Sequence, residues 1–159
     1  MSPDPALTFT GTRWIDPRGQ RFGAALSALL LSVAVLTGSL WLAMAVGVAL
    51  ALSASFGTRW SIFGRPWPLL RRLLRLAPTE PEHEYPPRFA QALGATFIGG
   101  GSLLLLAGIR PWGWLPVMGV IALQVLLAAT GYCLGCRLYF VRWYLPALFT
   151  RLIGRSTAP

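Results

Sequence analysis

Residues 89 to 109 read FAQALGATFIGGGSLLLLAGI, and this stretch decides the class of fold. It contains 21 residues without a charge and lies between Arg88 and Arg110. At a rise of about 1.5 Å per residue, an α-helix of this length extends about 31 Å, which matches the roughly 30 Å hydrocarbon core of a bilayer. The stretch therefore predicts a membrane-spanning helix over 89–109.

The composition of the whole chain agrees with this prediction. Of its 159 residues, 55% are hydrophobic and only 12% are charged, with a mean hydropathy of +0.58. Soluble domains carry about 25% charged residues. The chain is therefore expected to be an all-α, polytopic membrane protein with the lipid bilayer as its main environment.

The other apolar stretches predict three further spanning helices. Residues 114–136 form one, which ends before Arg137. Between Arg21 and Arg59 lie 37 uncharged residues, too many for one crossing. A break at 37–39 predicts two short helices, 22–36 and 40–56, which would need a locally thinner bilayer or burial against partners. The chain thus predicts four transmembrane helices arranged as two hairpins.

The arginines predict how this domain, residues 22–137, is oriented. All 14 basic residues are arginines, and four spans place every one except Arg110 on the side of the tail 1–21, the loop 57–88 and the tail 138–159. The positive-inside rule then makes both termini cytoplasmic, whereas three spans would divide the arginines between the two faces. The charge of +9 is explained by this topology, so no nucleic-acid partner is expected. The long first apolar block is expected to remain as an anchor rather than a cleaved signal peptide.

A short internal repeat accompanies the two predicted hairpins. The pattern R-F-x-x-A-L-x-A occurs at 21–28 and again at 88–95, and Trp-Leu occurs at 41–42 and 114–115. Each pair falls at the beginning of corresponding helices. The pattern favours two related hairpins in the same orientation.

The connection between the hairpins has two parts. Residues 66–76, PWPLLRRLLRL, group leucines against arginines and predict a short amphipathic helix on the membrane surface. Residues 77–87 contain three glutamates and the only histidine, His83, among prolines that oppose a regular helix. This second part is expected to be a solvated loop.

The chain has two cysteines, Cys133 and Cys136, at the predicted cytoplasmic end of the fourth span. On a helix, this spacing places both side chains on one face. C-x-x-C is also the spacing of thiol–disulfide exchange sites, and Arg137 would favour a thiolate, so both cysteines are candidate catalytic residues. Carbonyls at the end of a helix would disfavour the thiolate, unless Gly131 and Gly135 break the helix and a new one begins there. A reducing cytoplasm disfavours a permanent structural disulfide there.

Other interpretations of the cysteines stay open. Cys133, Cys136 and His83 could bind a metal, although a single C-x-x-C is an incomplete zinc signature. The cysteines could also only pack a helix end in a noncatalytic membrane scaffold or assembly subunit. Transport of a small sulfur compound is a weaker alternative, because no charged residue lies inside a span. The sequence indicates no cofactor, and whether the protein is an enzyme stays open.

Three motifs resemble a known family. DPRGQRF at 16–22, PPRFAQALGA at 86–95 and TGYCLGCRLY at 130–139 are similar to domain of unknown function 4395, a group of small bacterial integral membrane proteins. The resemblance extends from about Ile15 to Phe140 and implies a bacterial inner-membrane location. Members joined or adjacent to thioredoxin-like or rhodanese-like domains imply a soluble partner of that kind for thiol or sulfur chemistry. The resemblance supplies no catalytic mechanism.

Overall fold

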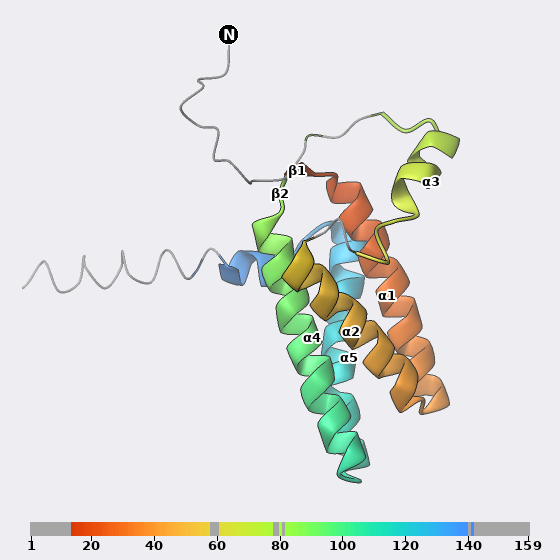
Figure 1. Cartoon of the computed structure of the whole chain (residues 1–159), viewed down its shortest axis with the longest axis vertical. Helices are drawn as coiled ribbons and strands as arrows, with labels where there is room; N and C mark the ends of the chain where they lie inside the picture. The colour runs from red at the N-terminus through yellow and green to blue at the C-terminus, as the bar shows by residue number, and fades with distance from the viewer. Residues whose placement is uncertain (1–13, 58–60, 78–79, 81, 140, 142–159) are drawn as a thin grey trace, which may run out of the picture.

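The structure of the chain is a computed structural model that describes residues 14–57, 61–77, 80, 82–139 and 141. Helices dominate it, as predicted. Four long helices form a bundle (Figure 1): α1 (Pro17–Thr37), α2 (Leu40–Phe56), α4 (Tyr85–Leu106) and α5 (Arg110–Thr130). Smaller elements lie at one end of it: α3 (Trp67–Leu73), β1 (Trp14–Ile15) and β2 (Glu82–His83).

The lengths of the helices support a membrane protein. Among the described residues, α1, α4 and α5 are long and apolar enough to cross a bilayer, with 21, 22 and 21 residues. Helix α2 is equally apolar but has only 17 residues, or about 25 Å at 1.5 Å per residue. The prediction of two short helices in the first apolar block is therefore right for α2 and wrong for α1.

Helices α1 and α4 both begin before the predicted residues 22 and 89. The carboxylate of Asp16 accepts a hydrogen bond of 2.9 Å from the Arg18 N–H, and proline follows in the first turn. Prolines also occupy the first turn of α4. Proline fits there because its missing N–H would have no partner in a first helical turn. Arg21 and Arg88 consequently lie inside the helices rather than before them.

Helix α5 ends earlier than predicted. Gly131 adopts a left-handed conformation, with φ of 76°, and its N–H bonds to the Leu127 carbonyl at 2.9 Å. This geometry terminates a helix and is accessible to glycine at little cost. The helix therefore ends at Thr130, and the predicted extension of the span to Cys136 is wrong.

The bundle closes as a ring in which α2 packs on α4, α4 on α5, and α5 on α1, with a smaller contact between α1 and α2. Its centre contains the fully buried side chains of Leu31, Ile98 and Val117. Helices α4 and α5 approach most closely at Gly101 and Gly113. A Cβ added to Gly101 would lie 2.5 Å from the Gly113 carbonyl oxygen. In lipid, helices gain nothing from burying apolar side chains, because the lipid tails are equally apolar. Close packing of backbones at small residues such as these glycines stabilises their association instead.

Arg21 and Arg88, which occupy the same position in the internal repeat, also make the same contact. The guanidinium of Arg21 donates to the carbonyls of Ala128 and Ala129 at the end of α5, at 2.9 to 3.1 Å. That of Arg88 donates at 2.9 and 2.8 Å to the carbonyls of residues 54 and 55, at the end of α2. Each arginine thus caps carbonyls that have no partner within their own helix, and it does so for the other hairpin.

The loop between α2 and α4 contains structure that the sequence did not predict. Strands β1 and β2 pair antiparallel, with Trp14 opposite His83 and Ile15 opposite Glu82. His83 therefore belongs to a small sheet rather than to a free loop, and the all-α prediction omitted this sheet. Helix α3 lies within the predicted 66–76 helix but ends at Leu73, since Arg75 turns the backbone to φ of 49°.

Candidate functional site

The two cysteines follow α5 directly, on a separate piece of backbone. Residues 134–139 are helical, so Cys133 immediately precedes a new short helix. The Cys133 sulfur accepts from the Cys136 N–H at 3.1 Å, and its carbonyl accepts from the Arg137 N–H at 3.1 Å. Gly135 lets this helix rest on α4, because a Cβ there would lie 2.7 Å from Cβ of Ala90. The break in the helix thus places the pair at a helix start.

Cys133 and Cys136 are joined by a disulfide, with their Cα atoms 5.2 Å apart. Both residues are half-buried, so the sulfur atoms are neither in the core nor fully in solvent. The structure therefore brings the two predicted site residues together and holds them in the oxidised form. Reduction would place a thiol pair at the same point, with the Cys136 N–H directed at the Cys133 sulfur.

An outer cavity of about 640 Å³ surrounds the disulfide. Both cysteines line it, and the ionisable residues beside them are Arg21, Arg137, His83 and Glu82. The guanidinium of Arg137 lies over the ring of Tyr132, 5.2 Å from its centre. Two arginines against one glutamate make the lining net positive, which favours an anion in this cavity, including a thiolate. The cavity thus gives the pair an accessible and basic surrounding.

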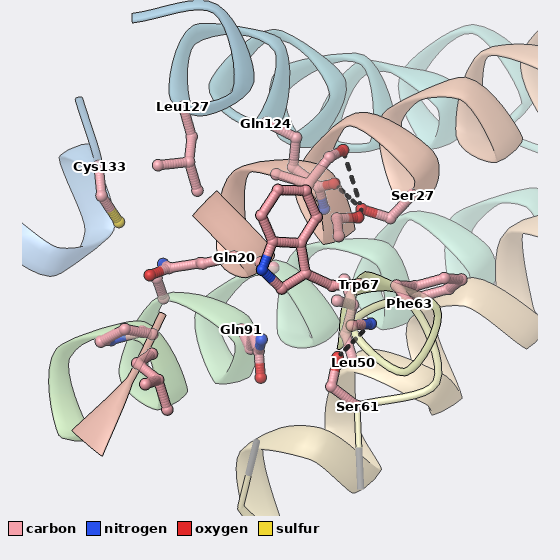
Figure 2. A pocket seen from close by; sticks show the side chains of 18 of the residues that line it. Gln20, Ser27, Leu50, Ser61, Phe63, Trp67, Gln91, Gln124, Leu127 and Cys133 are labelled. Atoms are coloured by element: carbon pink, nitrogen blue, oxygen red, sulfur yellow. Dashed lines mark hydrogen bonds between the residues drawn. The ribbon is translucent and has the colours of Figure 1, made fainter. Parts of the chain in front are cut away.

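An inner cavity of about 300 Å³ lies on the other side of Cys133. Figure 2 shows it between α1, α4 and α5, with Trp67 of α3 and Phe63 of the preceding turn across it. The only three glutamines of the chain, Gln20, Gln91 and Gln124, line it, one from each helix. Cys133 lines both cavities, whereas Cys136 lines only the outer one.

Polar groups are built into the wall of the inner cavity. The buried hydroxyl of Ser27 bonds to Oε1 of Gln124 (Figure 2). Oε1 of Gln91 is buried and has no hydrogen-bond partner within the described part of the chain. Gln20 places its Nε2 3.9 Å from the Cys136 sulfur. Sequence reasoning missed this cluster, although the placement of a glutamine in three of the four long helices was a usable signal.

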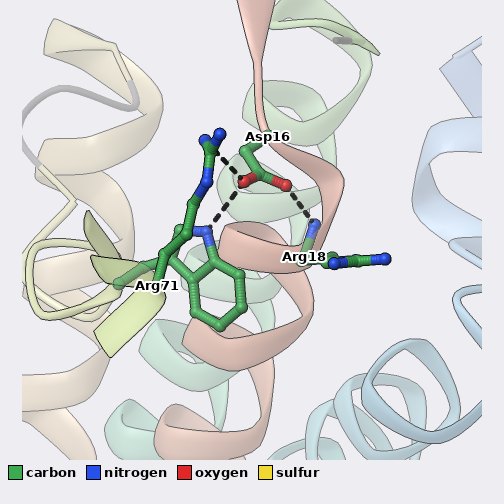
Figure 3. A network of polar contacts seen from close by, with 4 residues as sticks. Asp16, Arg18 and Arg71 are labelled. Carbon is green, nitrogen blue, oxygen red and sulfur yellow. Dashed lines mark hydrogen bonds and ion pairs between the residues drawn. The ribbon is translucent and has the colours of Figure 1, made fainter. Parts of the chain in front are cut away.

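Asp16 fixes the segment that covers the inner cavity. Its Oδ2 accepts from the indole N–H of Trp67 at 2.9 Å and pairs with Arg71 at 3.5 Å (Figure 3). Its Oδ1 accepts from the Arg18 N–H, which caps α1. Gly19 leaves room for the indole, since a Cβ there would lie 2.7 Å from Cδ1 of Trp67. The carboxylate of Asp16 therefore caps the first turn of α1 and also holds α3 over the inner cavity through Trp67 and Arg71.

The structure gives the metal hypothesis little support. His83 and the two cysteines line the same outer cavity. In the parts of the chain that the structure describes, however, no group of three histidine, cysteine or acidic side chains could hold an ion. Both sulfurs are also bonded to each other. The predicted three-residue ligand set is therefore not assembled.

These observations define a helical membrane protein with a C-x-x-C disulfide at the end of its bundle. The family model described as Domain of unknown function (DUF4395) matches residues 15–143, and the chain belongs to this family. This confirms the resemblance to that family. No curated protein and no solved structure matches the chain.

Proposed function

We propose that all four long helices cross the bacterial inner membrane and that both termini are cytoplasmic. Within the described residues, every arginine except Arg110 lies toward the end of the bundle where α1 and α4 begin (Figure 1). The positive-inside rule makes this the cytoplasmic end. The short α2 is accommodated by local thinning of the bilayer around it.

We further propose that the Cys133–Cys136 pair exchanges disulfides or sulfur with a soluble thioredoxin-like or rhodanese-like partner. The observation that carries this proposal is the half-exposed disulfide on a basic cavity at that end of the bundle. A disulfide used only for packing would not need an open cavity around both sulfurs. The position also lies outside the spanning helices, where a soluble protein can approach.

The exchange follows from the positions of the two sulfurs. A thiolate of the partner attacks the Cys136 sulfur, which faces only the outer cavity. The bond between the cysteines breaks, and Cys133 leaves as a thiolate that the Cys136 N–H can stabilise. The second thiol of the partner then attacks its own mixed disulfide, so the partner is oxidised and the cysteine pair is reduced. A persulfide partner would instead pass its outer sulfur to a thiolate of the reduced pair.

Single and double cysteine variants test this function in intact cells. Cys133→Ser leaves a Cys136 thiolate that can attack the disulfide of the oxidised partner, whose second cysteine leaves as a thiolate. Because the Cys133 thiol that would release this product is absent, a mixed disulfide should accumulate and appear as a larger band on a nonreducing gel. Cys136→Ser should trap less, and the double variant none. An identical band pattern in the wild type and all three variants would instead favour the noncatalytic scaffold, in which the cysteines only pack.

A further inference from the structure

We propose that the inner cavity binds the ring of a membrane quinone, which reoxidises the Cys133–Cys136 pair. This inference rests on the proposed thiol exchange, because an exchange site that oxidises its partner must itself be reoxidised. It adds a ligand site inside the bundle, separate from the outer cavity where the partner acts. Cys133 connects the two, since it lines both cavities.

The lining of the inner cavity selects an uncharged ligand. Among the described residues that line it, the only ionisable side chain besides Cys133 is Asp16. That carboxylate is already engaged by the Trp67 indole, Arg71 and the Arg18 N–H. An anion such as a sulfur oxyanion would lose its hydration without gaining a counter-charge, which is costly in an apolar site. A small ion is therefore a poor occupant, and a neutral molecule is a good one.

The size and the polar groups of the cavity fit a quinone ring. A volume of about 300 Å³ is at the lower end of ordinary ligand pockets, enough for a substituted ring but too small for a whole flavin nucleotide. The two oxygens of a quinone accept hydrogen bonds, and those of a quinol donate them. The amides of Gln91 and Gln124 can do both, and Gln91 Oε1 is a buried acceptor that lacks a donor. The aromatic rings of Trp67 and Phe63 offer flat apolar contact.

The chemistry balances for a two-electron carrier. The thiolate of reduced Cys133 adds to a ring carbon, which forms a carbon–sulfur bond. The thiolate of Cys136 then attacks the Cys133 sulfur, so the sulfur–sulfur bond forms and the carbon–sulfur bond breaks. Both electrons of the broken bond stay in the ring. The protons of the two thiols end on the two ring oxygens, and one dithiol and one quinone yield one disulfide and one quinol.

Binding is tested with a photoreactive short-chain quinone on the full-length protein in lipid nanodiscs. The label should attach to peptides from α1, α4 or α5 that line the cavity. Gln91→Leu with Gln124→Leu keeps the side-chain volume but removes both amides, and should weaken labelling by about tenfold. Thr96→Val is the matched control, because the Thr96 side chain is exposed and bonds to the Ala92 carbonyl of its own helix. Thermal unfolding midpoints show that each variant is folded. Equal labelling of all variants would overturn the site.

Turnover separates this inference from the proposed function. Chemically reduced wild-type protein, mixed with a short-chain quinone, should form one quinol for each disulfide regained, and Cys133→Ser should form none. If the wild-type pair exchanges with a soluble dithiol protein but forms no quinol, the inference is overturned and the proposed function stands. If quinol forms but no soluble protein exchanges with the pair, the quinone site is supported and the proposed partner is rejected.

Discussion

The two halves of the bundle are built alike, each from two consecutive helices, but they differ in the segment that follows the second helix. The hairpin of α1 and α2 and that of α4 and α5 each contain the R-F-x-x-A-L-x-A pattern within the first turns of their first helix. Each also ends its second helix at a glycine with positive φ. Gly57 leads into the segment that includes α3, whereas Gly131 leads into the cysteine pair. The repeated part is therefore structural, and the cysteine pair belongs to the second half alone.

The halves also differ in how tightly their own helices pack. Gly101 and Gly113 bring α4 and α5 into backbone contact. The glycine at the middle of α2, Gly47, instead faces Ile98 of α4, with a Cβ distance of 2.9 Å to its Cγ2 atom. The first hairpin is therefore held mainly through the second. The following substitutions test this difference between the two hairpins, in order of decreasing expected loss of unfolding free energy.

Gly101→Leu should have the largest effect, because it forces apart α4 and α5 at their closest point. Overpacking of this kind costs about 3 kcal/mol, measured as a fall in the unfolding free energy in mixed micelles. Gly99→Leu is the control in the same helix, since nothing lies within 4 Å of a Cβ at Gly99. Similar losses in both variants would mean that the close approach is not what stabilises the second hairpin.

Arg21→Ala and Arg88→Ala should each cost about 2 kcal/mol, because each leaves two helix-end carbonyls without a charged donor. Equal losses would support the equivalence of the two halves. Arg110→Ala, at the opposite end of the bundle, should change the unfolding free energy by less than about 0.5 kcal/mol.

The two arginine variants should differ in a second measurement. Arg21 lines the outer cavity, and Arg88 does not line it. Only Arg21→Ala should therefore slow reduction of the disulfide by a soluble dithiol protein. Equal slowing in both variants would show that the effect comes from lost stability rather than from charge near the sulfurs.

Asp16→Ala should cost about 1.5 kcal/mol, since it removes the cap of α1 together with the contact to Trp67. Asp16→Asn should cost less than half of this, because asparagine also caps helices and the lost ion pair with Arg71 is near the surface. Thermal unfolding checks both. An equal loss in the two variants would assign the stability to the charge.

Gly38→Ala and Gly108→Ala should have the smallest effects, about 1 kcal/mol each, because both turns use a positive φ, 65° and 81°. Gly119→Ala provides a control of opposite sign. It lies within α5 with open space around a Cβ, so alanine should raise the unfolding midpoint slightly. A destabilising Gly119→Ala would show that this face of α5 is packed rather than open.

The sequence predicted the helices well where composition alone determines them. The charge-free stretch before Arg110 identified α4, and the break at 37–39 separated α1 from α2. The ends were less accurate, since the Asp16 cap and the left-handed Gly131 depend on backbone geometry that hydropathy does not encode. The strand pairing of Trp14 with His83 joins residues far apart in the chain, and a local pattern could not reveal it.

For the candidate site, too, the sequence predicted what depends on local spacing but not what depends on the packing of distant helices. The spacing of Cys133 and Cys136 predicted that they would meet. The glycines at 131 and 135 offered a helix break as one alternative, but only the structure shows that α5 ends before Gly131. The inner cavity could not be predicted, because it exists only where three helices meet and small residues such as Gly94 leave space. A single glutamine in an apolar helix indicates polarity, but not that three such amides line one cavity.

Arg21 caps the end of α5 and Arg88 caps the end of α2, so each arginine serves a helix of the other hairpin. This arrangement has a consequence for biogenesis. When α1 and α2 have been synthesised, the end of α2 still lacks its donor, because Arg88 comes later in the chain. Arg21 in turn waits for the carbonyls at the end of α5. Neither hairpin can therefore reach its final state on the ribosome before the other is synthesised. Two separately expressed halves, cut between α2 and α4, should each be short-lived alone and should restore one another when produced together.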